Sequence, residues 1–360
     1  MTRRNNYYVV IMAGGIGTRF WPVSKKSFPK QFMDILGTGQ SLITQTFRRF
    51  SEFIPKENIY VVTNVEYTDL VKEHIPEISD NQILGEPVGK NTAPCIAYAT
   101  YRLQQINPEA TCIIAPSDHL ITQEKTFQET ALKALDFASN NDALVTLGIK
   151  PSRPDTGYGY IQFNPEQYET GIHSVKTFTE KPTEEIAKTF IDSKEFLWNA
   201  GIFAWNIKTI SSRFEKNLPE IHQLFSEIDY TDSQASNQLE RAYGESPSIS
   251  IDYGIMEKEE NVFVLPANFG WSDLGTWKSL WDVSSKDSAN NSVISKNVRY
   301  YESSENLIYS PNGKLVILSG VENMVVIDSD DVLLVMNKDK EQELRGIVNE
   351  VKEKFKGKYN

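Results

Sequence analysis

The stretch that decides the fold is Tyr8-Val9-Val10-Ile11-Met12-Ala13-Gly14-Gly15-Ile16-Gly17-Thr18-Arg19-Phe20-Trp21-Pro22, which Phe28-Pro29-Lys30-Gln31 follows closely. An apolar run of strand length enters a glycine-rich turn at Gly14. Closely spaced glycines let backbone N–H groups approach phosphate oxygens, and Arg19 and Lys30 add positive charge. The stretch therefore predicts a buried first strand that ends in a phosphate-binding loop.

This loop matches neither of the two best-known glycine motifs. A Walker A loop carries Gly-Lys-Ser or Gly-Lys-Thr after four intervening residues, whereas these glycines lead to Thr18-Arg19. A dinucleotide fingerprint needs a third glycine where Phe20 stands. On the glycines alone, a plain strand-to-helix turn without a ligand stays an open alternative, so the two cations are the informative part.

The composition excludes several classes of protein. The 360 residues are enough for one large or two ordinary domains. The formal charge of −11 argues against a nucleic-acid partner, which would need a surplus of Lys and Arg on one face. No apolar run approaches the roughly 20 residues that cross a bilayer, so we expect a soluble protein with no membrane partner. Cys95 and Cys112 fit neither a disulfide framework nor a metal site, and we expect a cytoplasmic protein in which both are reduced.

Short Val/Ile-rich runs alternate with longer helical patterns over the first 150 residues. In chain order we expect a strand at 58–63, a helix at 65–74, a strand at 111–115, a helix at 125–139 and a strand at 143–148. This alternation predicts βαβ units on a parallel sheet with helices on both faces. Ligands of such sheets lie at the carboxyl ends of the strands. The polar clusters 14–19, 86–94 and 116–119 follow predicted strands, and we expect them to meet at one cleft.

Beyond residue 150 the pattern changes twice. Residues 153–206 loosen into strands and loops, which we interpret as a second lobe facing the first. Farther on, Asp252 is expected to cap a short helix. After Trp281, short strands near Val293, Leu307, Leu315, Met324 and Val332 recur about every eight to ten residues, which predicts a small all-β module.

The printed sequence closes with a predicted amphipathic helix at 338–356, whose apolar residues repeat at helical spacing. Such a helix needs a docking surface, and the sequence leaves open whether its own domain or a partner subunit provides it. We place a catalytic domain at residues 1–283 and the β module with its terminal helix at 284–360.

A series of ordered segments resembles the sugar nucleotidyltransferases, which make nucleoside diphosphate sugars, and within them the mannose-1-phosphate guanylyltransferases (GDP-mannose pyrophosphorylases). These segments are 13–21, 29–32, 86–94, 116–119, 178–182, 198–203, 250–258 and 270–277. So many matches in order, over almost the whole chain, are very specific. The resemblance implies a Rossmann-like (glycosyltransferase-A-like) α/β fold, with a mixed sheet flanked by helices, a small β-helix-like C-terminal module and a terminal helix.

The resemblance also implies a reaction. The phosphate oxygen of mannose 1-phosphate attacks the α-phosphorus of GTP, which gives GDP-mannose and pyrophosphate. Joining two polyanions needs cations and a divalent metal, Mg²⁺ or another such as Mn²⁺, and no covalent enzyme intermediate. At this length we expect one activity, without the isomerase domain of longer relatives. Many members of the family associate, so a homodimer stays open.

Carried over residue by residue, the resemblance assigns roles to particular side chains. The catalytic set is Arg19, Lys30, Asp118 and Lys181, and the expected metal ligands are Asp118 and Asp273. The nucleotide-binding set is Ala13, Gly14, Gly15, Gly17, Thr18, Glu86, Asn91, Thr92 and Ser117. The sugar-phosphate-binding set is Gly159, Glu180, Lys181 and Asn199.

The chemistry of single residues supports two of these assignments. Asp118 follows the apolar run 112–115, and a strand end presents a carboxylate that suits a hard ion such as Mg²⁺. Glu86 can accept both the N1–H and the exocyclic amine of guanine, but a Glu86 that only caps the helix starting near Thr92 stays an alternative. His119 needs no role as a base, because the attacking phosphate is already anionic near neutral pH.

Two positions depart from the family pattern. Lys25 and Lys90 stand where arginine is expected, so positive charge is kept but the bidentate fork of a guanidinium is lost.

Three other functions remain as alternatives. The first is a nucleotidyltransferase for another sugar 1-phosphate or another base. The second is a catalytically silent nucleotide-sugar sensor, which predicts damage at the catalytic and metal positions, all of which are intact. The third is a plain nucleotide-binding module, which leaves residues 153–206 unexplained.

Overall fold

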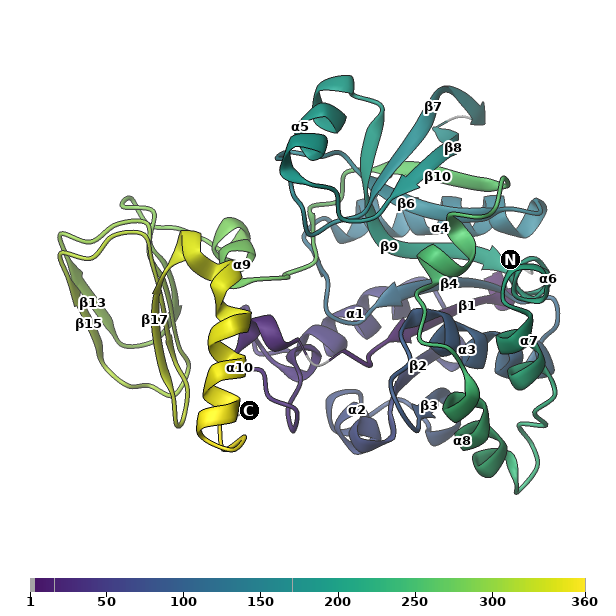
Figure 1. The fold of residues 1–360 in the computed structure, drawn as a ribbon, viewed down its shortest axis with the longest axis horizontal. Helices are drawn as coiled ribbons and strands as arrows, with labels where there is room; N and C mark the ends of the chain where they lie inside the picture. The colour runs from purple at the N-terminus through teal and green to yellow at the C-terminus, as the bar shows by residue number, and fades with distance from the viewer. Residues whose placement is uncertain (1–3, 16, 170, 360) are drawn as a thin grey trace. The chain divides into compact units, whose positions relative to one another are not determined.

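The computed structural model describes residues 4–15, 17–169 and 171–359 (Figure 1). The fold divides into two compact units, each made from separate stretches of the chain. The first takes the chain up to Gly14, then Thr46–Ser117 and Ile121–Trp271, and the second takes Gly15–Gln45, Asp118–Leu120 and the chain from Ser272 onward. Most of the glycine-rich loop therefore belongs to the second unit.

The first unit is built on one nine-stranded sheet, in the order β3-β2-β1-β4-β9-β6-β10-β8-β7 (Figure 1). Its strands are β1 Tyr7–Met12, β2 Ile59–Asn64, β3 Ile83–Glu86, β4 Thr111–Pro116, β6 Leu144–Ile149, β7 Tyr160–Glu169, β8 Ile172–Thr179, β9 Phe196–Asn206 and β10 Val262–Ala267. β3, β2, β1 and β4 run parallel, whereas β9 runs antiparallel to β4 and β6. The mixed α/β sheet is confirmed. The parallel arrangement predicted for the first 150 residues is also confirmed, since β6 has the same direction as β4, and the antiparallel strands come from residues beyond 150.

β1 is an interior strand because both of its faces are apolar. Tyr8 and Val10 join a buried cluster with α3 (Thr92–Ile106), α6 (Ile207–Asn217) and α7 (Pro219–Ser226). Val9 and Ile11 point to the other face, since side chains alternate along a strand, and both are 0% exposed. A strand covered on both faces is typical of the parallel part of an α/β sheet.

Helices cover this sheet. The other helices of the first unit are α2 Thr68–His74, α4 Glu124–Asn140, α5 Glu184–Ser193 and α8 Ala235–Glu245, while α1 Leu42–Ser51 enters the unit at Thr46. α3 packs on β2 and β3, and α4 packs on β4, β6, β9 and β10. Cys95 on α3 and Cys112 on β4 are both buried and free. Within the described ranges, no helix combines the length and apolarity needed to cross a membrane.

Residues 153–206 do not form a second lobe, contrary to the prediction. Their strands extend the same sheet: β9 lies between β4 and β6, and β7 pairs with both β8 and β9. β9 is mostly buried, whereas much of β7 and β8 is partly or fully exposed. The loose pattern in the sequence therefore reflects a sheet edge in contact with solvent.

The second unit contains a module of short strands. They are β12 Ser292–Ser295, β13 Val298–Tyr301, β14 Leu307–Ser310, β15 Val316–Ser319, β16 Met324–Asp328 and β17 Leu333–Asn337. β12, β14 and β16 pair in parallel, as do β13 and β15, and β17 adds antiparallel to β16. This arrangement confirms the predicted β-helix-like module. β13 was outside the prediction because its side chains are mostly exposed and show no apolar alternation.

The terminal helix docks on its own unit, which settles the alternative that the sequence left open. Helix α10 spans Leu344–Lys354, and the segment before it, Lys338–Glu343, is a 3₁₀-helix. Leu344 is buried in one apolar cluster with Trp21 and with residues of α9 (Trp277–Val283), and Val348 and Val351 pack against that cluster. The Trp21 Nε1–H also donates to the Tyr359 carbonyl oxygen at 2.7 Å.

Gly148→Ala in β6 should lower the free energy of unfolding by about 1–3 kcal/mol through overpacking. A Cβ atom at this position would lie 2.6 Å from Leu197 Cδ1 and 2.7 Å from Val264 Cγ2, so the neighbouring strands must move apart. Urea unfolding followed by circular dichroism measures the change. Gly244→Ala in α8 is the matched control, since its Cβ meets nothing within 4 Å and should stabilise the helix by roughly 0.4–1 kcal/mol. Equal effects at the two sites would contradict the packing argument.

Candidate active site

In the first unit, the carboxyl ends of β1, β3 and β4 lie along one edge, because these strands run parallel. Ala13 follows β1 and is held there: its N–H donates to Val62 O at 2.7 Å, and its carbonyl oxygen accepts from Thr63 Oγ1 at 2.9 Å. Ser117 follows β4, is buried, and donates its N–H to Met12 O at 3.0 Å. Both predicted nucleotide-binding residues therefore have a fixed backbone at this edge.

Glu86 ends β3 at the same edge and is buried, with 4% of its surface exposed. Its Oε1 accepts a hydrogen bond from Tyr243 Oη at 3.0 Å, and a Cβ atom on Gly14 would lie 3.0 Å from its Oε2. Burial raises the pKa of Glu86 to about 7, although the Tyr243 hydrogen bond lowers it. Gly14 therefore leaves just enough room for a carboxyl group that titrates near neutral pH.

Two of the predicted nucleotide-binding residues, Asn91 and Thr92, make structural hydrogen bonds at the start of α3. The Asn91 side chain caps this helix by accepting from the Thr92 N–H at 2.9 Å, so the alternative that Glu86 is the cap is wrong. Thr92 Oγ1 accepts from the Ile251 N–H at 2.8 Å. Of the two, only Asn91 is exposed.

A row of three residues crosses the sheet where β7, β8 and β9 meet. Tyr160 on β7 pairs with Thr179 on β8 and with Trp198 on β9, so the antiparallel register continues to Gly159, Glu180 and Asn199. The Asn199 N–H donates to Gly159 O at 2.8 Å, and a Cβ atom on Gly159 would lie 2.5 Å from Glu180 Oε2.

Lys181 follows this row with a positive φ of 45° and an exposed ammonium group. That ammonium pairs with Glu180 at 2.9 Å. The structure thus brings together all four residues of the predicted sugar-phosphate set, although about 40 positions separate the first from the last in the sequence.

Asp252 is a member of this group that sequence analysis missed. It caps no helix, contrary to the prediction: it begins the one-turn π-helix η7 (Asp252–Met256), and its carboxylate accepts from Asn199 Nδ2 at 2.8 Å. The pKa of Asp252 is raised to about 6, by burial and by the nearby Glu180 carboxylate, against the Asn199 hydrogen bond. The sequence signal that could have identified Asp252 is its carboxylate within segment 250–258, which resembles the family.

In the second unit, Lys30 links two of the predicted acidic positions. Its side chain is 4% exposed, and Nζ lies 2.8 Å from Asp118 Oδ2, 2.9 Å from Asp273 O and 2.8 Å from Leu274 O. Gly17 has a φ of 68°, and a Cβ atom there would lie 2.6 Å from Lys30 Cβ, so the loop approaches this lysine only because it has glycine at that point.

The rest of the loop is open to solvent. Gly15, Thr18 and Arg19 are exposed, and the last two lie in the 3₁₀-helix η2 (Thr18–Phe20). The predicted phosphate-binding residues of the second unit are therefore accessible, whereas Lys30 is enclosed.

Asp118 stays ionised in this setting. Burial alone would raise its pKa, but the charges of Lys30 and His119 and the hydrogen bond from Lys30 outweigh burial, so the pKa of Asp118 is lowered from its ordinary value. His119 thus acts on Asp118 as a neighbouring charge.

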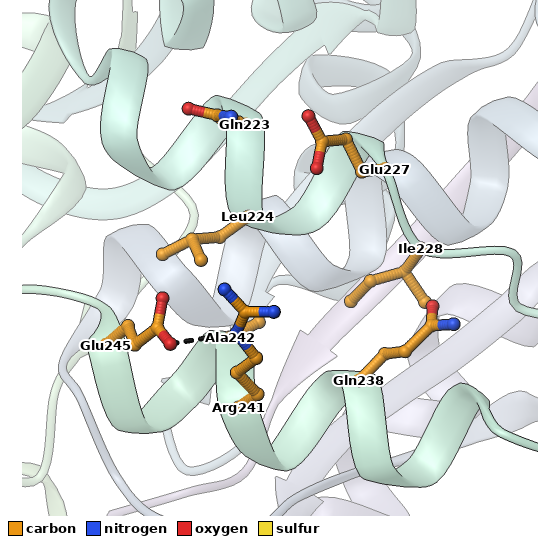
Figure 2. A pocket seen from close by; sticks show the side chains of 8 residues that line it. All are labelled: Gln223, Leu224, Glu227, Ile228, Gln238, Arg241, Ala242 and Glu245. Carbon is orange, nitrogen blue, oxygen red and sulfur yellow. Dashed lines mark hydrogen bonds and ion pairs between the residues drawn. The ribbon is translucent and has the colours of Figure 1, made fainter.

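A separate surface hollow of about 480 Å³ lies between α7 and α8 (Figure 2). Its charged side chains are of both signs, and Arg241 is already paired with Glu245 at 2.8 Å. None of the predicted site residues lines this hollow.

Two family models match the chain. The one described as nucleotidyl transferase matches residues 8–290, and the one described as MannoseP isomerase/GMP-like beta-helix domain matches residues 296–351. The chain belongs to the nucleotidyl transferase family.

Named relatives agree with this membership. The chain is 34% identical over 348 residues to the alginate biosynthesis protein AlgA of Pseudomonas aeruginosa, covering 95% of this chain and 71% of that protein. It is 35% identical over 355 residues to a mannose-1-phosphate guanylyltransferase of Salmonella muenchen, with 95% and 73% covered. A crystal structure from Thermus thermophilus, described as a mannose-1-phosphate geranyltransferase, has a TM-score of 0.86 at 30% identity and covers 96% of this chain and 99% of that chain.

Nucleotidyl transferases generally use a divalent metal, and the second unit carries the two carboxylates predicted to bind it. Asp118 is anionic. The backbone carbonyl oxygen of Asp273 accepts from Lys30, while its carboxylate Oδ1 accepts from the Gly275 N–H at 3.0 Å. Among residues 4–15, 17–169 and 171–359, no group of three or more His, Cys, Asp or Glu side chains is gathered as a metal site. A hard cation held by one or two carboxylates takes its remaining ligands from water and substrate phosphates, which is the usual coordination of Mg²⁺.

Asp252→Asn should make this nucleotidyl transferase more stable at alkaline pH. The folded-state pKa of about 6 lies above the ordinary value of 3.8, so Asp252 stabilises the fold while protonated, and that stability is lost as the pH rises through 6. At 1.36 kcal/mol per pKa unit, the variant should gain roughly 1–3 kcal/mol at pH 8 and less at pH 5.

Urea unfolding at the two pH values measures this gain, with the exposed Asp192→Asn as the control. A gain that is the same at pH 5 and pH 8 would show that the pKa of Asp252 is not raised.

Proposed function

We propose that this chain transfers GMP from GTP to α-D-mannose 1-phosphate, which forms GDP-mannose and pyrophosphate. The observation that carries the proposal is the ion pair between the enclosed Lys30 and Asp118 directly beside the glycine-rich loop, because it joins a candidate metal ligand to a phosphate-binding segment. The choice of mannose and GTP rests on the named relatives, which are 34–35% identical to the chain.

In this proposal different residues bind the triphosphate and the phosphate of the sugar. In the second unit, Arg19 binds the triphosphate, and Lys30 holds Asp118 in place. Asp118 and Asp273 would hold Mg²⁺ or Mn²⁺, which when bound neutralises charge on the phosphates. In the first unit, the ammonium of Lys181 binds the phosphate of the sugar.

The mannose ring and the guanine base have separate sites in the proposal. Gly159, Glu180 and Asn199 offer the sugar hydroxyls a backbone group, a carboxylate and an amide. Glu86 receives the base together with the loop backbone and Asn91, Thr92 and Ser117. Attack by the sugar phosphate needs no general base, because that phosphate is already anionic.

We extend the proposal to the whole protein in three respects. The catalytic domain is residues 1–283 and the C-terminal module is 284–360. The enzyme works in the cytoplasm, in keeping with two free, buried cysteines. It forms a homodimer through the module, where β17 exposes Leu333 (63%) and Val335 (52%).

The purified protein, given GTP, Mg²⁺ and mannose 1-phosphate, should release pyrophosphate faster than with any other pair of nucleotide and sugar phosphate. Asp118→Ala should abolish turnover, whereas Lys181→Ala should mainly raise KM for mannose 1-phosphate, by about tenfold or more, through the loss of a charged contact. Lys188→Ala is the control, because this lysine is exposed on α5 and pairs with Glu184 of the same helix at 2.8 Å.

Pyrophosphate release that stays at the blank level with every pair would overturn the enzyme proposal. Faster turnover with another sugar phosphate would support the alternative nucleotidyltransferase instead.

Glu86→Gln should reduce the preference for GTP over ITP, which lacks the exocyclic amine. A carboxylate accepts both guanine donors, whereas an amide presents its own N–H groups to one of them, so kcat/KM for GTP should fall by about 10–100-fold and that for ITP by less. Steady-state rates with the two nucleotides give the ratio. An equal fall for both would mean that Glu86 serves the Tyr243 contact and not the base.

A further inference from the structure

Helix α10 and the glycine-rich loop line an open cavity of about 290 Å³ within the second unit. Its lining consists of Thr18, Arg19, Trp21, Ser24, Lys25, Lys26, Arg345, Val348, Asn349 and Lys352. Five of these side chains are cationic and none is acidic. The charge of this lining is therefore opposite in sign to the formal net charge of −11 of the whole chain.

Most of this charge is not compensated by the protein. Lys25 pairs with Asp331 at 2.8 Å. No ion pair or side-chain hydrogen bond to a carboxylate is found for Arg19, Arg345 or Lys352 among the residues that the structure describes. Like charges that gather without counter-ions repel one another, and a bound anion relieves that repulsion. The mixed hollow between α7 and α8 differs, because its arginine is paired.

One face of α10 lines the cavity. Arg345, Asn349 and Lys352 stand at positions i, i+4 and i+7, which share a face of an α-helix. Leu344 is buried in the apolar cluster of the second unit, and Val351 packs against it, so α10 is fixed in this orientation. The apolar face docks the helix, and the adjoining polar face reaches the loop that carries Arg19.

We propose that Arg345 and Lys352 of α10 bind the terminal phosphates of the nucleoside triphosphate and the pyrophosphate that leaves. The proposal rests on the proposed function, and it adds the terminal helix to a site otherwise formed by the loop. A pyrophosphate carries several negative charges and matches a cavity lined by several cations. Arg345 also supplies a planar guanidinium beside Lys25, and only a guanidinium can bind two phosphate oxygens in parallel.

Reverse-direction kinetics test the proposal, with GDP-mannose and pyrophosphate as substrates. The double variant Arg345→Gln/Lys352→Gln should raise KM for pyrophosphate by about tenfold or more, since two charged hydrogen-bonding groups are lost, and leave KM for GDP-mannose within about twofold. Forward KM should rise for GTP and stay unchanged for mannose 1-phosphate. Arg345→Lys should show a smaller rise, because charge is kept and the fork is lost.

Lys354→Gln is the matched control, since it removes one charge from the same helix outside the cavity lining. A double variant whose KM for pyrophosphate rises no more than in this control would overturn the proposal.

Isothermal titration with pyrophosphate and Mg²⁺ distinguishes a failure of the anion-site proposal from a failure of the proposed function. If wild type is inactive with every substrate pair yet binds pyrophosphate more tightly than the double variant does, the anion site stands and the proposed reaction falls. If the double variant loses binding in titration but keeps both KM values, the cavity is a separate anion site, and its assignment to the leaving group is wrong.

Discussion

The enclosed ammonium of Lys30 is the constraint on which the second unit depends. It touches the Asp118 carboxylate and the carbonyl oxygens of Asp273 and Leu274, all within 2.9 Å. A buried charge that loses a partner is strongly destabilising, so this contact ties the glycine-rich loop, the turn after β4 and the turn before α9 to one another. The same contact keeps Asp118 ionised, which makes one group both a structural partner and a candidate metal ligand.

Where local sequence carries the structural signal, prediction succeeded. β1 is apolar on both faces and α3 begins at Thr92, as the sequence suggested, although the cap is Asn91 and not Glu86. Prediction failed where the structure of a segment depends on which distant strand it pairs with. The edge strands β7 and β8 are largely solvated, so they were misread as a lobe, and β13 has too few buried side chains to show any period.

The candidate site shows the same division. The family-like segments name Gly159, Glu180 and Asn199, and pairing of β7 with both β8 and β9 brings them together. The hydrogen bond between Asn199 and Asp252 could not be predicted, because it joins β9 to a π-helix 53 positions later. The buried setting of Glu86 could not be predicted from the sequence either, since it includes a hydrogen bond from Tyr243 of the distant helix α8. Family resemblance finds the members of a site, while three-dimensional contacts set their protonation.

The docking of α10 has a consequence for biosynthesis. Phe20 and Trp21 are buried in one cluster with Leu274, Trp277 and Leu344, so this core joins residues that leave the ribosome long before the others do. The first unit has its sheet complete once β10 has emerged, whereas the apolar cluster of the second unit is complete only after α10 has emerged. Until then the nascent chain carries two large aromatic side chains without their cover, and the loop between β1 and α1 is the segment that chaperones would have to shield.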